Sequence, residues 1–320
     1  MLPPTGRDRD ELLRAAVAAP SMHNTQPWRF RFDGCVIEVH RDRARELPAE
    51  DPDRRMLHVS LGAAVFNLRV EAAHLAYGSQ VRSVLDRARP DLVAEVELVG
   101  AGAETEELYR LAPYLQVRRT NRQPYQDRRV PDEVRRLLDV SSRLEGTELQ
   151  WIGDRARLKW LYLATNDADL EDDRNAARSE ERRLWVGGDR TADGIPSTAL
   201  GPRATSPDSP ARDMAAMPAD SGRPMATFEQ EPQLAILATR RDGPAEWLRA
   251  GQAMQRVLLE ATANGLSTSL LNQAIEHDTL RWLVHDPLGS WTRPQAVIRF
   301  GYGPPVPPTP RRPISDVLLR

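Results

Sequence analysis

Two long apolar segments that share a spacing of small residues constrain the fold of this chain most. Apolar periodicity predicts helices over residues 61–77 and 245–264, the second ending at Gly265, a residue type typical of helix C-termini. The shared spacing is that of Gly62, Ala64, Glu71 and Ala72 and of Gly251, Ala253, Glu260 and Ala261. Small residues let two helices approach closely, as they do across a two-fold axis.

The segments around these helices follow a similar order in the two halves of the chain. In the first half, a helix is expected over residues 8–19 and strands over 28–32, 36–39, 80–85 and 93–98, the first two joined by a hairpin. In the second half, a helix begins at Pro131, and strands are expected over 149–152, 234–238 and 295–300. Four matching positions in the two helices could arise by chance. The matching order of predicted helices and strands in the two halves favours a duplicated unit.

The expected fold is therefore α+β, with mostly antiparallel sheets and two degenerate halves around the long central helices. The halves would span residues 1–115 and 116–320. Residues 187–227 interrupt the second half, because they are rich in Gly, Pro, Ser and Asp and show no sustained apolar period. The apolar residues scattered among them favour a lid that packs on the rest of the molecule over a disordered insertion.

Composition and charge exclude several classes of partner. The 320 residues include 44 basic and 46 acidic side chains, a formal charge of -2, which argues against nucleic acid or an anionic membrane as a partner. Cys35 is the only cysteine, which fits a reducing compartment. We find no apolar signal peptide and no segment of about 20 apolar residues that would span a membrane. We therefore expect a cytoplasmic protein.

A dense polar turn follows the first helix. Ser21, His23, Asn24 and Gln26 fall within six residues, between Pro20 and the first aromatic strand. A turn capped by its own side chains would use some of these groups, since Ser and Asn favour turns. Turns rarely need all four together, which favours a ligand site.

A basic segment, Arg118-Arg119-Thr120-Asn121-Arg122, is the second candidate site. Three guanidinium groups and a hydroxyl could hold a phosphate monoester through charge-assisted hydrogen bonds, although a solvated basic run has the same composition. Arg311-Arg312 near the end of the chain says little by itself. The sequence has no phosphate-binding loop, no serine-hydrolase elbow and no metal-ligand spacing, so no metal is expected.

Taken together, these motifs resemble the nitroreductase family of flavoproteins, and most closely its actinobacterial Acg subgroup, in which one chain contains both halves of a nitroreductase dimer. The resemblance covers essentially the whole chain. It is carried by residues 19–30, 118–122 and 265–267 and by residues 300–303 through 311–313.

The resemblance implies one composite FMN site built from both halves. Arg118, Arg119, Thr120 and Arg122 would bind the phosphate, and the turn would contact the ring and the ribityl chain through Ser21, Met22, His23, Asn24 and Gln26. Gly265, Leu266 and Ser267 would place backbone groups beside the flavin, and Arg311 or Arg312 would reach the phosphate.

The implied activity is an FMN oxidoreductase that takes a hydride from NAD(P)H and passes it to a small-molecule acceptor such as a nitro compound or a quinone. The flavin carries the hydride chemistry, so no side chain is expected to be catalytic. Two alternatives stay open: a non-catalytic protein that sequesters FMN beneath the lid, and a dehydrogenase in natural-product biosynthesis. A monomer is possible because the two halves would mimic a dimer.

Overall fold

The computed structural model describes residues 2–205, 222–284 and 292–319. The first half contains an antiparallel sheet with strand order β1-β2-β4-β3. Its strands are β1 (Trp28–Asp33), β2 (Val36–Arg41), β3 (Gly78–Ser83) and β4 (Leu92–Val99). Trp28 and Phe30 point to the buried face of β1, while Arg29 and Arg31 alternate with them on the other face.

Helices α1 (Gly6–Val17) and α2 (Arg55–His74) pack together beside this sheet. Helix α1 begins with a capping box, in which Thr5 and Asp8 each accept a hydrogen bond from the backbone N–H of the other. Helix α2 begins six residues before the predicted start at residue 61, because the carboxylate of Asp51 accepts the N–H groups of Met56 and Leu57 at 3.0 and 2.8 Å.

The second half contains an antiparallel sheet with strand order β5-β8-β10-β9. Its strands are β5 (Glu148–Trp151), β8 (Gln233–Thr239), β9 (Ser267–Leu270) and β10 (Arg293–Gly301). Helix α7 (Pro244–Ala263) covers one face, and α4 (Asp132–Leu144) packs against α7 and β5. The predicted helix at Pro131 and the three predicted strands are confirmed in position, whereas β9 was not predicted.

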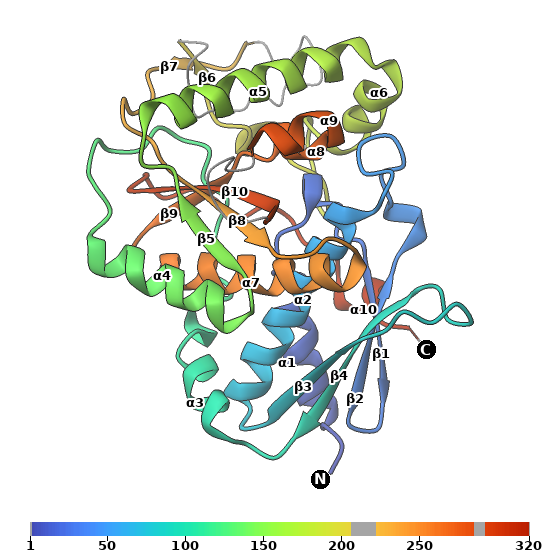
Figure 1. Ribbon diagram of the computed structural model, residues 1–320. Coiled ribbons are helices and arrows are strands. Elements are labelled where there is room, and N and C mark those ends of the chain that lie inside the picture. The colour runs from blue at the N-terminus through green and yellow to red at the C-terminus, as the bar shows by residue number, and fades with distance from the viewer. Residues whose placement is uncertain (1, 206–221, 285–291, 320) are drawn as a thin grey trace.

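The other face of the second sheet carries a further layer. Leu234 and Ile236 of β8 pack there against α5 and α8, whereas Ala235 and Leu237 face α7. Figure 1 shows the resulting order of layers, with the first sheet at the bottom and α5 at the top. The helices of this layer are α5 (Arg155–Arg174), α6 (Ala176–Trp185), α8 (Gln273–Glu276) and α9 (Asp278–Arg281).

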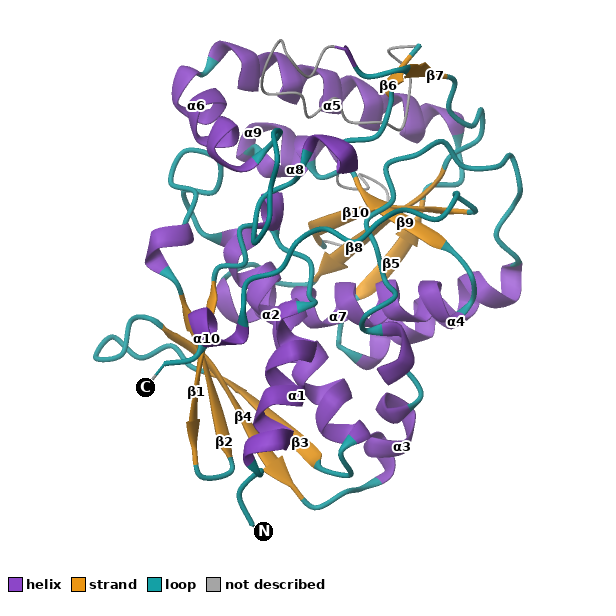
Figure 2. Ribbon diagram, turned by 180° about the vertical axis from the view of Figure 1, so that it is seen from behind, coloured by secondary structure: helices purple, strands orange, loops and turns teal. Residues whose placement is uncertain are grey.

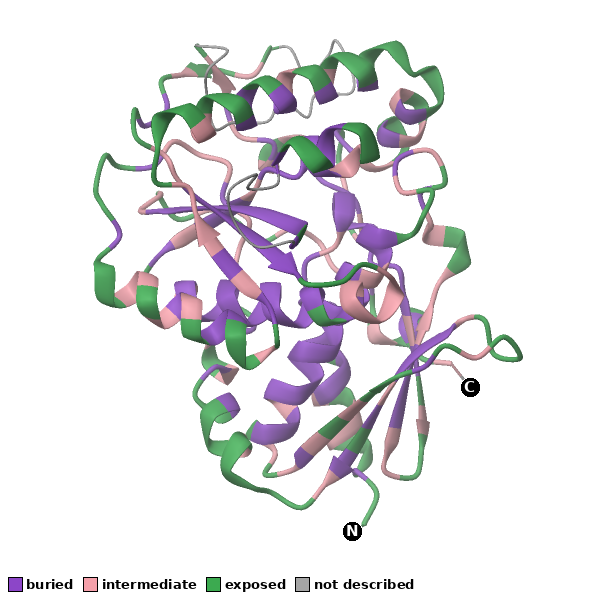
Figure 3. Cartoon of the chain, viewed as in Figure 1, coloured by how far each residue is buried: buried purple, intermediate pink, exposed green. Residues whose placement is uncertain are grey.

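The two long helices cross at their glycines, as their spacing predicts. The Cα of Gly251 would lie 2.9 Å from a Cβ added at Gly62, and that Cβ would overlap the carbonyl oxygen of Leu248. The relation is reciprocal, because a Cβ at Gly251 would overlap the carbonyl oxygen of Val59. Val59 and Leu248 each precede their glycine by three residues, so the contact has local two-fold character. Figure 3 shows both helices buried along most of their lengths.

The remaining segments join the two halves. Helix α3 (Ala103–Tyr109) packs on α2, and the chain then passes into the second half. At the other end, α10 (Ile314–Val317) returns to α1 and β1, near the first sheet, as Figure 2 shows from behind. The expected insertion at residues 187–227 contains the short parallel pair β6 (Arg203–Ala204) and β7 (Met225–Ala226). Residues 206–221 of this insertion lie outside the described ranges.

Each sheet lies wholly within one of the expected halves, since β4 ends at Val99 and β5 begins at Glu148. The predicted α+β class and the mostly antiparallel sheets are confirmed. The division at residue 115 stays a prediction, because α10 of the second half packs on elements of the first.

Candidate functional site

The polar turn at residues 20–27 has an unusual backbone. His23, Asn24 and Gln26 adopt left-handed conformations, with φ of 48°, 55° and 52°. Such values are uncommon outside glycine and cluster at functional sites. The turn is held by its own groups, since the Gln26 N–H donates to Ser21 Oγ at 2.9 Å and Thr25 Oγ1 donates to the Met22 carbonyl at 2.9 Å.

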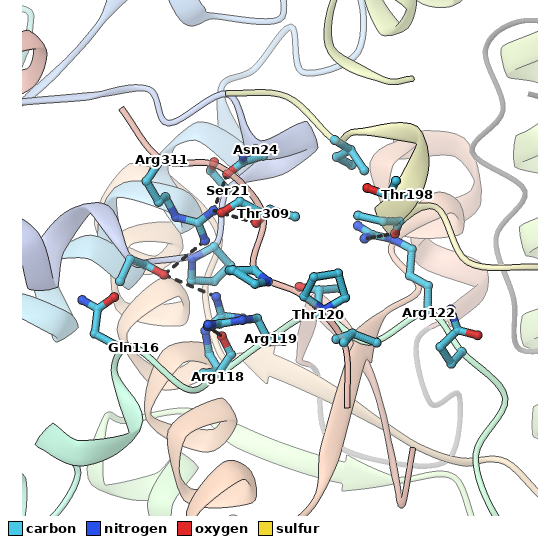
Figure 4. Close-up of a pocket in the computed structure, with 18 residues that line it drawn as sticks. Ser21, Asn24, Gln116, Arg118, Arg119, Thr120, Arg122, Thr198, Thr309 and Arg311 are labelled. Atoms are coloured by element: carbon cyan, nitrogen blue, oxygen red, sulfur yellow. Dashed lines mark hydrogen bonds between the residues drawn. The ribbon is translucent and has the colours of Figure 1, made fainter. Parts of the chain in front are cut away.

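A cavity lies between this turn, the basic segment and the C-terminal tail, and we call it the polar cavity for the arginine, amide and hydroxyl side chains among its lining residues. About 920 Å³ of space lies between its walls, including the part open to solvent. Figure 4 shows Arg118, Arg119 and Arg311 gathered on one side and Arg122 and Thr198 on the other. The predicted residues that line this cavity are Ser21, Asn24, Arg118, Arg119, Thr120, Arg122 and Arg311.

Three of these arginines, Arg118, Arg119 and Arg311, form what we call the arginine cluster, to which no described residue offers a carboxylate within ion-pair distance. Arg118 donates to the Ala18 carbonyl at 3.3 Å, and its Nε and Nη1 are buried with no hydrogen-bond partner among the described residues. Arg119 donates to the carbonyl of Arg118 at 2.8 Å. Arg311 donates to Asn24 Oδ1 at 3.0 Å and to Thr309 Oγ1 at 2.7 Å. All these acceptors are neutral.

Among the described residues, only cations act on the charges of Arg118 and Arg311. Burial, together with the charges of Arg311 and Arg119, lowers the pKa of Arg118 to about 9. Burial and the charge of Arg119 lower the pKa of Arg311 to about 10. A buried cation is costly without a counter-ion, so this arrangement favours the binding of an anion with several acceptor oxygens.

A second, mostly apolar cavity continues from the polar one. The two cavities share Pro20, Ser21, Thr120, Arg122 and Ile195. The second cavity is further lined by Met22, His23, Met56, Val59, Ser60, Met254, Leu270, Asn272 and Glu276. Its methionines come from the turn and from both long helices, and flexible thioether side chains adapt to flat apolar ligands.

The first part of the insertion lies directly over both cavities. Ile195 lines the two cavities, and Thr198 and Ala199 line the polar one. The Asn24 side chain donates to the Gly194 carbonyl at 2.8 Å, and Arg122 Nη1 donates to the Ala199 carbonyl at 3.1 Å. Residues 195–199 therefore supply part of the cavity walls, and their action as a lid stays a prediction.

Five predicted residues do not line either cavity. Gln26 is fully buried and donates to the Ala192 carbonyl at 2.9 Å. Arg312 donates to the Gln26 carbonyl at 3.0 Å and to Asp42 at 3.2 Å. Gly265 ends α7 with φ of 72°, and Leu266 is buried in the core.

Ser267, the last of the five, begins β9 and accepts a hydrogen bond from Asn121 Nδ2 at 3.2 Å. The N–H of Asn121 also donates to the Thr268 carbonyl at 2.8 Å. Strand β9 thus fixes the basic segment beside the cavity. The contacts of these five residues with a cofactor stay predictions.

Sequence reasoning missed most of the apolar cavity. Met56 precedes the helix predicted at residues 61–77, and Met254 lies in a stretch of α7 where spacing does not distinguish a cavity wall from a packing contact. Gln116 and Thr309 of the polar cavity were also missed. Each lies within two residues of a predicted arginine, and this proximity was the available signal.

Comparison with known proteins places the chain in a family. No family model matches the sequence. The chain is 30% identical over 312 residues to the "Putative NAD(P)H nitroreductase acg" of Mycobacterium tuberculosis H37Rv, covering 95% of this chain and 93% of that protein. It is 30% identical over 315 residues to a second protein of that strain, "Putative NAD(P)H nitroreductase Rv3131", covering 96% of this chain and 90% of the relative.

A solved structure shows the same fold. The putative nitroreductase from Anabaena variabilis ATCC 29413 aligns over 92% of this chain and 88% of its own, with a TM-score of 0.56 and 11% identity. The chain therefore belongs to the nitroreductase family, as its motifs indicate. Within the described ranges, no helix is long and apolar enough to cross a membrane.

Proposed function

We propose that this chain binds FMN across the two cavities and passes a hydride from NAD(P)H through FMN to a small-molecule acceptor such as a nitro compound or a quinone. The observation that carries the proposal is the arginine cluster at one end of a cleft whose other end is lined by three methionine side chains. Relatives named NAD(P)H nitroreductases, 30% identical along nearly the whole chain, support the class of reaction.

The residues of the polar cavity fit a phosphate monoester on a polyhydroxylated chain. Arg118, Arg119 and Arg311 would hold the phosphate, because each guanidinium has N–H groups that are not used by its hydrogen bonds to neutral acceptors. Ser21 and Thr198 place hydroxyl groups in the same cavity, where a ribityl chain needs partners. The apolar cavity would then hold the ring system between Met22, Met56 and Met254.

When bound, FMN supplies the hydride chemistry, and the chain supplies orientation, charge and exclusion of water. The arginine cluster would fix one end of the cofactor, so that the ring lies in the methionine-lined cavity. Residues 192–201 would shield the ring from water by their contacts with Asn24 and Arg122.

Arg118→Gln and Arg311→Gln test the phosphate assignment, with riboflavin as the matched ligand that lacks the phosphate. Each variant should weaken FMN binding by about 1.5–3 kcal/mol, because each loses a charge-assisted hydrogen bond. Riboflavin affinity, measured by the same fluorescence titration, should stay unchanged. The exposed Arg87→Gln is the control. Variants that stay as yellow as the wild type after purification would refute the assignment.

The position of the lid favours a second candidate, a protein that sequesters FMN without turnover. Ile195 lines both cavities, where it would limit the space left for a nicotinamide beside a bound flavin ring. Anaerobic addition of NAD(P)H to the FMN-loaded protein separates the two functions. Rapid bleaching of the flavin absorbance supports the oxidoreductase, and an unchanged spectrum supports sequestration.

We further propose that residues 1–115 and 116–320 correspond to the two subunits of a dimeric nitroreductase. The reciprocal crossing of Gly62 and Gly251 and the two four-stranded sheets support this division. The polar turn comes from the first part and the basic segment from the second, so such a chain would hold one composite site.

A further inference from the structure

The His23 side chain belongs to a buried network of charged groups that links the turn to α6. Nε2 of His23 lies 2.6 Å from Oε2 of Glu50, and the two side chains are 1% and 0% exposed. The other carboxylate oxygen of Glu50 accepts from Nε and Nη2 of Arg182 at 2.9 and 2.6 Å. Arg182 lies on α6, whose end leads into the insertion. A residue of the second half therefore binds the Glu50 carboxylate of the first half.

Asp172 of α5 completes the network. Its carboxylate accepts from Arg182 and, at 2.6 Å, from Nε of Arg178, and it lies 2.9 Å from Nε2 of His277. Burial alone would raise the pKa of Asp172, but the hydrogen bond with His277 and the charges of Arg182 and Arg178 lower it. Two carboxylates, Glu50 and Asp172, thus face two guanidinium groups, and a third carboxylate, that of Glu171, lies 3.1 Å from Nδ1 of His277.

Arg182 fixes the role of His23 in this network. It holds Glu50 as a carboxylate, and an ionised carboxylate can only accept, so Nε2 of His23 carries the hydrogen of their contact. In the neutral imidazole with this hydrogen, Nδ1 is a bare acceptor. It is buried, without a hydrogen-bond partner among the described residues, on a residue that lines the apolar cavity.

We propose that Glu50, held by Arg182, fixes His23 as the Nε2–H tautomer, and that Nδ1 accepts a hydrogen bond from an N–H or O–H group of the ligand in the apolar cavity. Buried acceptors are nearly always satisfied, and a ligand is the partner that this one lacks. Glu50 and Arg182 are positioning residues in this scheme. The ligand half of the inference rests on the proposed function, since the imide N–H of a flavin ring is a donor of this kind.

Two substitutions of His23 separate its two nitrogens. The amide of His23→Asn reaches the position of Nδ1 and can present an oxygen there, and Asn tolerates the left-handed backbone of this residue. The longer amide of His23→Gln reaches the position of Nε2 and keeps the bond to Glu50 only. We expect FMN affinity to fall about tenfold in His23→Gln and to stay within about threefold of the wild type in His23→Asn.

Glu50→Gln should reverse the tautomer. Arg182 needs an acceptor, so the amide oxygen would face Arg182 and the NH₂ group would face His23. Nε2 would then accept, and the hydrogen would move to Nδ1. ¹⁵N NMR of the histidine rings reports which nitrogen is protonated, without any ligand, and His23→Asn identifies the His23 signal. FMN affinity should fall at least as far as in His23→Gln.

The outcomes distinguish this inference from the proposed function. A wild-type His23 that is protonated on Nδ1 at neutral pH overturns the tautomer assignment, whether or not FMN binds and whether or not the variants fold. A wild type that binds FMN, with equal affinity in His23→Gln, overturns the role of Nδ1. A wild type with the Nε2–H ring that does not bind FMN overturns the proposed function and its ligand, while the role of Glu50 is confirmed.

Discussion

The buried guanidinium of Arg118 lowers the free energy of unfolding of the FMN-free chain. Burial and two neighbouring cations lower its pKa in the folded chain to about 9, from an ordinary value of 12.5. A basic group with a lowered pKa destabilises the folded state wherever it is charged, and the penalty is relieved only as pH rises through the folded-state pKa. At neutral pH the FMN-free protein therefore bears this penalty.

We expect Arg118→Met to stabilise the FMN-free protein by about 1–3 kcal/mol at pH 7, because an apolar side chain of similar length replaces a buried, unpaired charge. Thermal unfolding without flavin measures the change, and the exposed Arg87→Met is the control. The same variant should lose the stabilisation that added FMN gives to the wild type. A lower melting temperature for FMN-free Arg118→Met would mean that the guanidinium supports the fold.

At this scale, sequence reasoning finds residues that stand close together in the chain and misses distant partners. Ser21, Asn24 and Arg118 are predicted because polar groups are dense around them, and they do line the polar cavity. Glu50 lies in an irregular segment without periodicity, and Arg182 meets it from 132 residues away. Only folding brings such a pair together, so no local pattern reveals it.

The crossing of α2 and α7 carries a prediction at the scale of elements. Gly62→Ala and Gly251→Ala should each destabilise the protein by about 1–3 kcal/mol, because a Cβ at either position overlaps a carbonyl oxygen of the facing helix. Gly6→Ala in α1 is the matched control, since its Cβ would meet nothing within 4 Å.

Chemical denaturation of the single variants and of the double variant measures the coupling between the two glycines. The double variant should lose less than the sum of the two, because the first methyl group already separates the helices. Full additivity, or tolerance of either alanine, would contradict the close approach at this crossing.

The apolar periodicity of the sequence predicts most helices and strands correctly, but it predicts their first and last residues less accurately. The crossing glycines, the hairpin and the helix after Pro131 all have local signatures in the sequence. Strand β9 was missed because its four residues, Ser267–Leu270, are mostly polar and pair with β10 only after folding. Helix α2 begins early because Asp51, outside the apolar pattern, caps it.

For the whole molecule, we expect one FMN per chain. The arginine cluster draws on residues 118, 119 and 311 and meets the turn at Ser21 and Asn24, so segments from three parts of the sequence form a single cavity. The ratio of flavin absorbance to protein concentration after gel filtration measures the stoichiometry. A ratio near two would show a second site in the other half and would contradict a single composite site.

The crossing of Gly62 and Gly251 affects how mutations can alter the contact between the two halves. In a symmetric homodimer each mutation appears on both sides of the interface at once. Here the two sides are encoded by separate codons, so each side can change while the other is kept. The outer face of the second sheet carries α5, from which α6 continues to Arg182, and the first sheet has no helix at the corresponding place among the described residues. Because the halves can change independently, the second half can supply supporting groups such as Arg182, while the first half supplies the polar turn of the site.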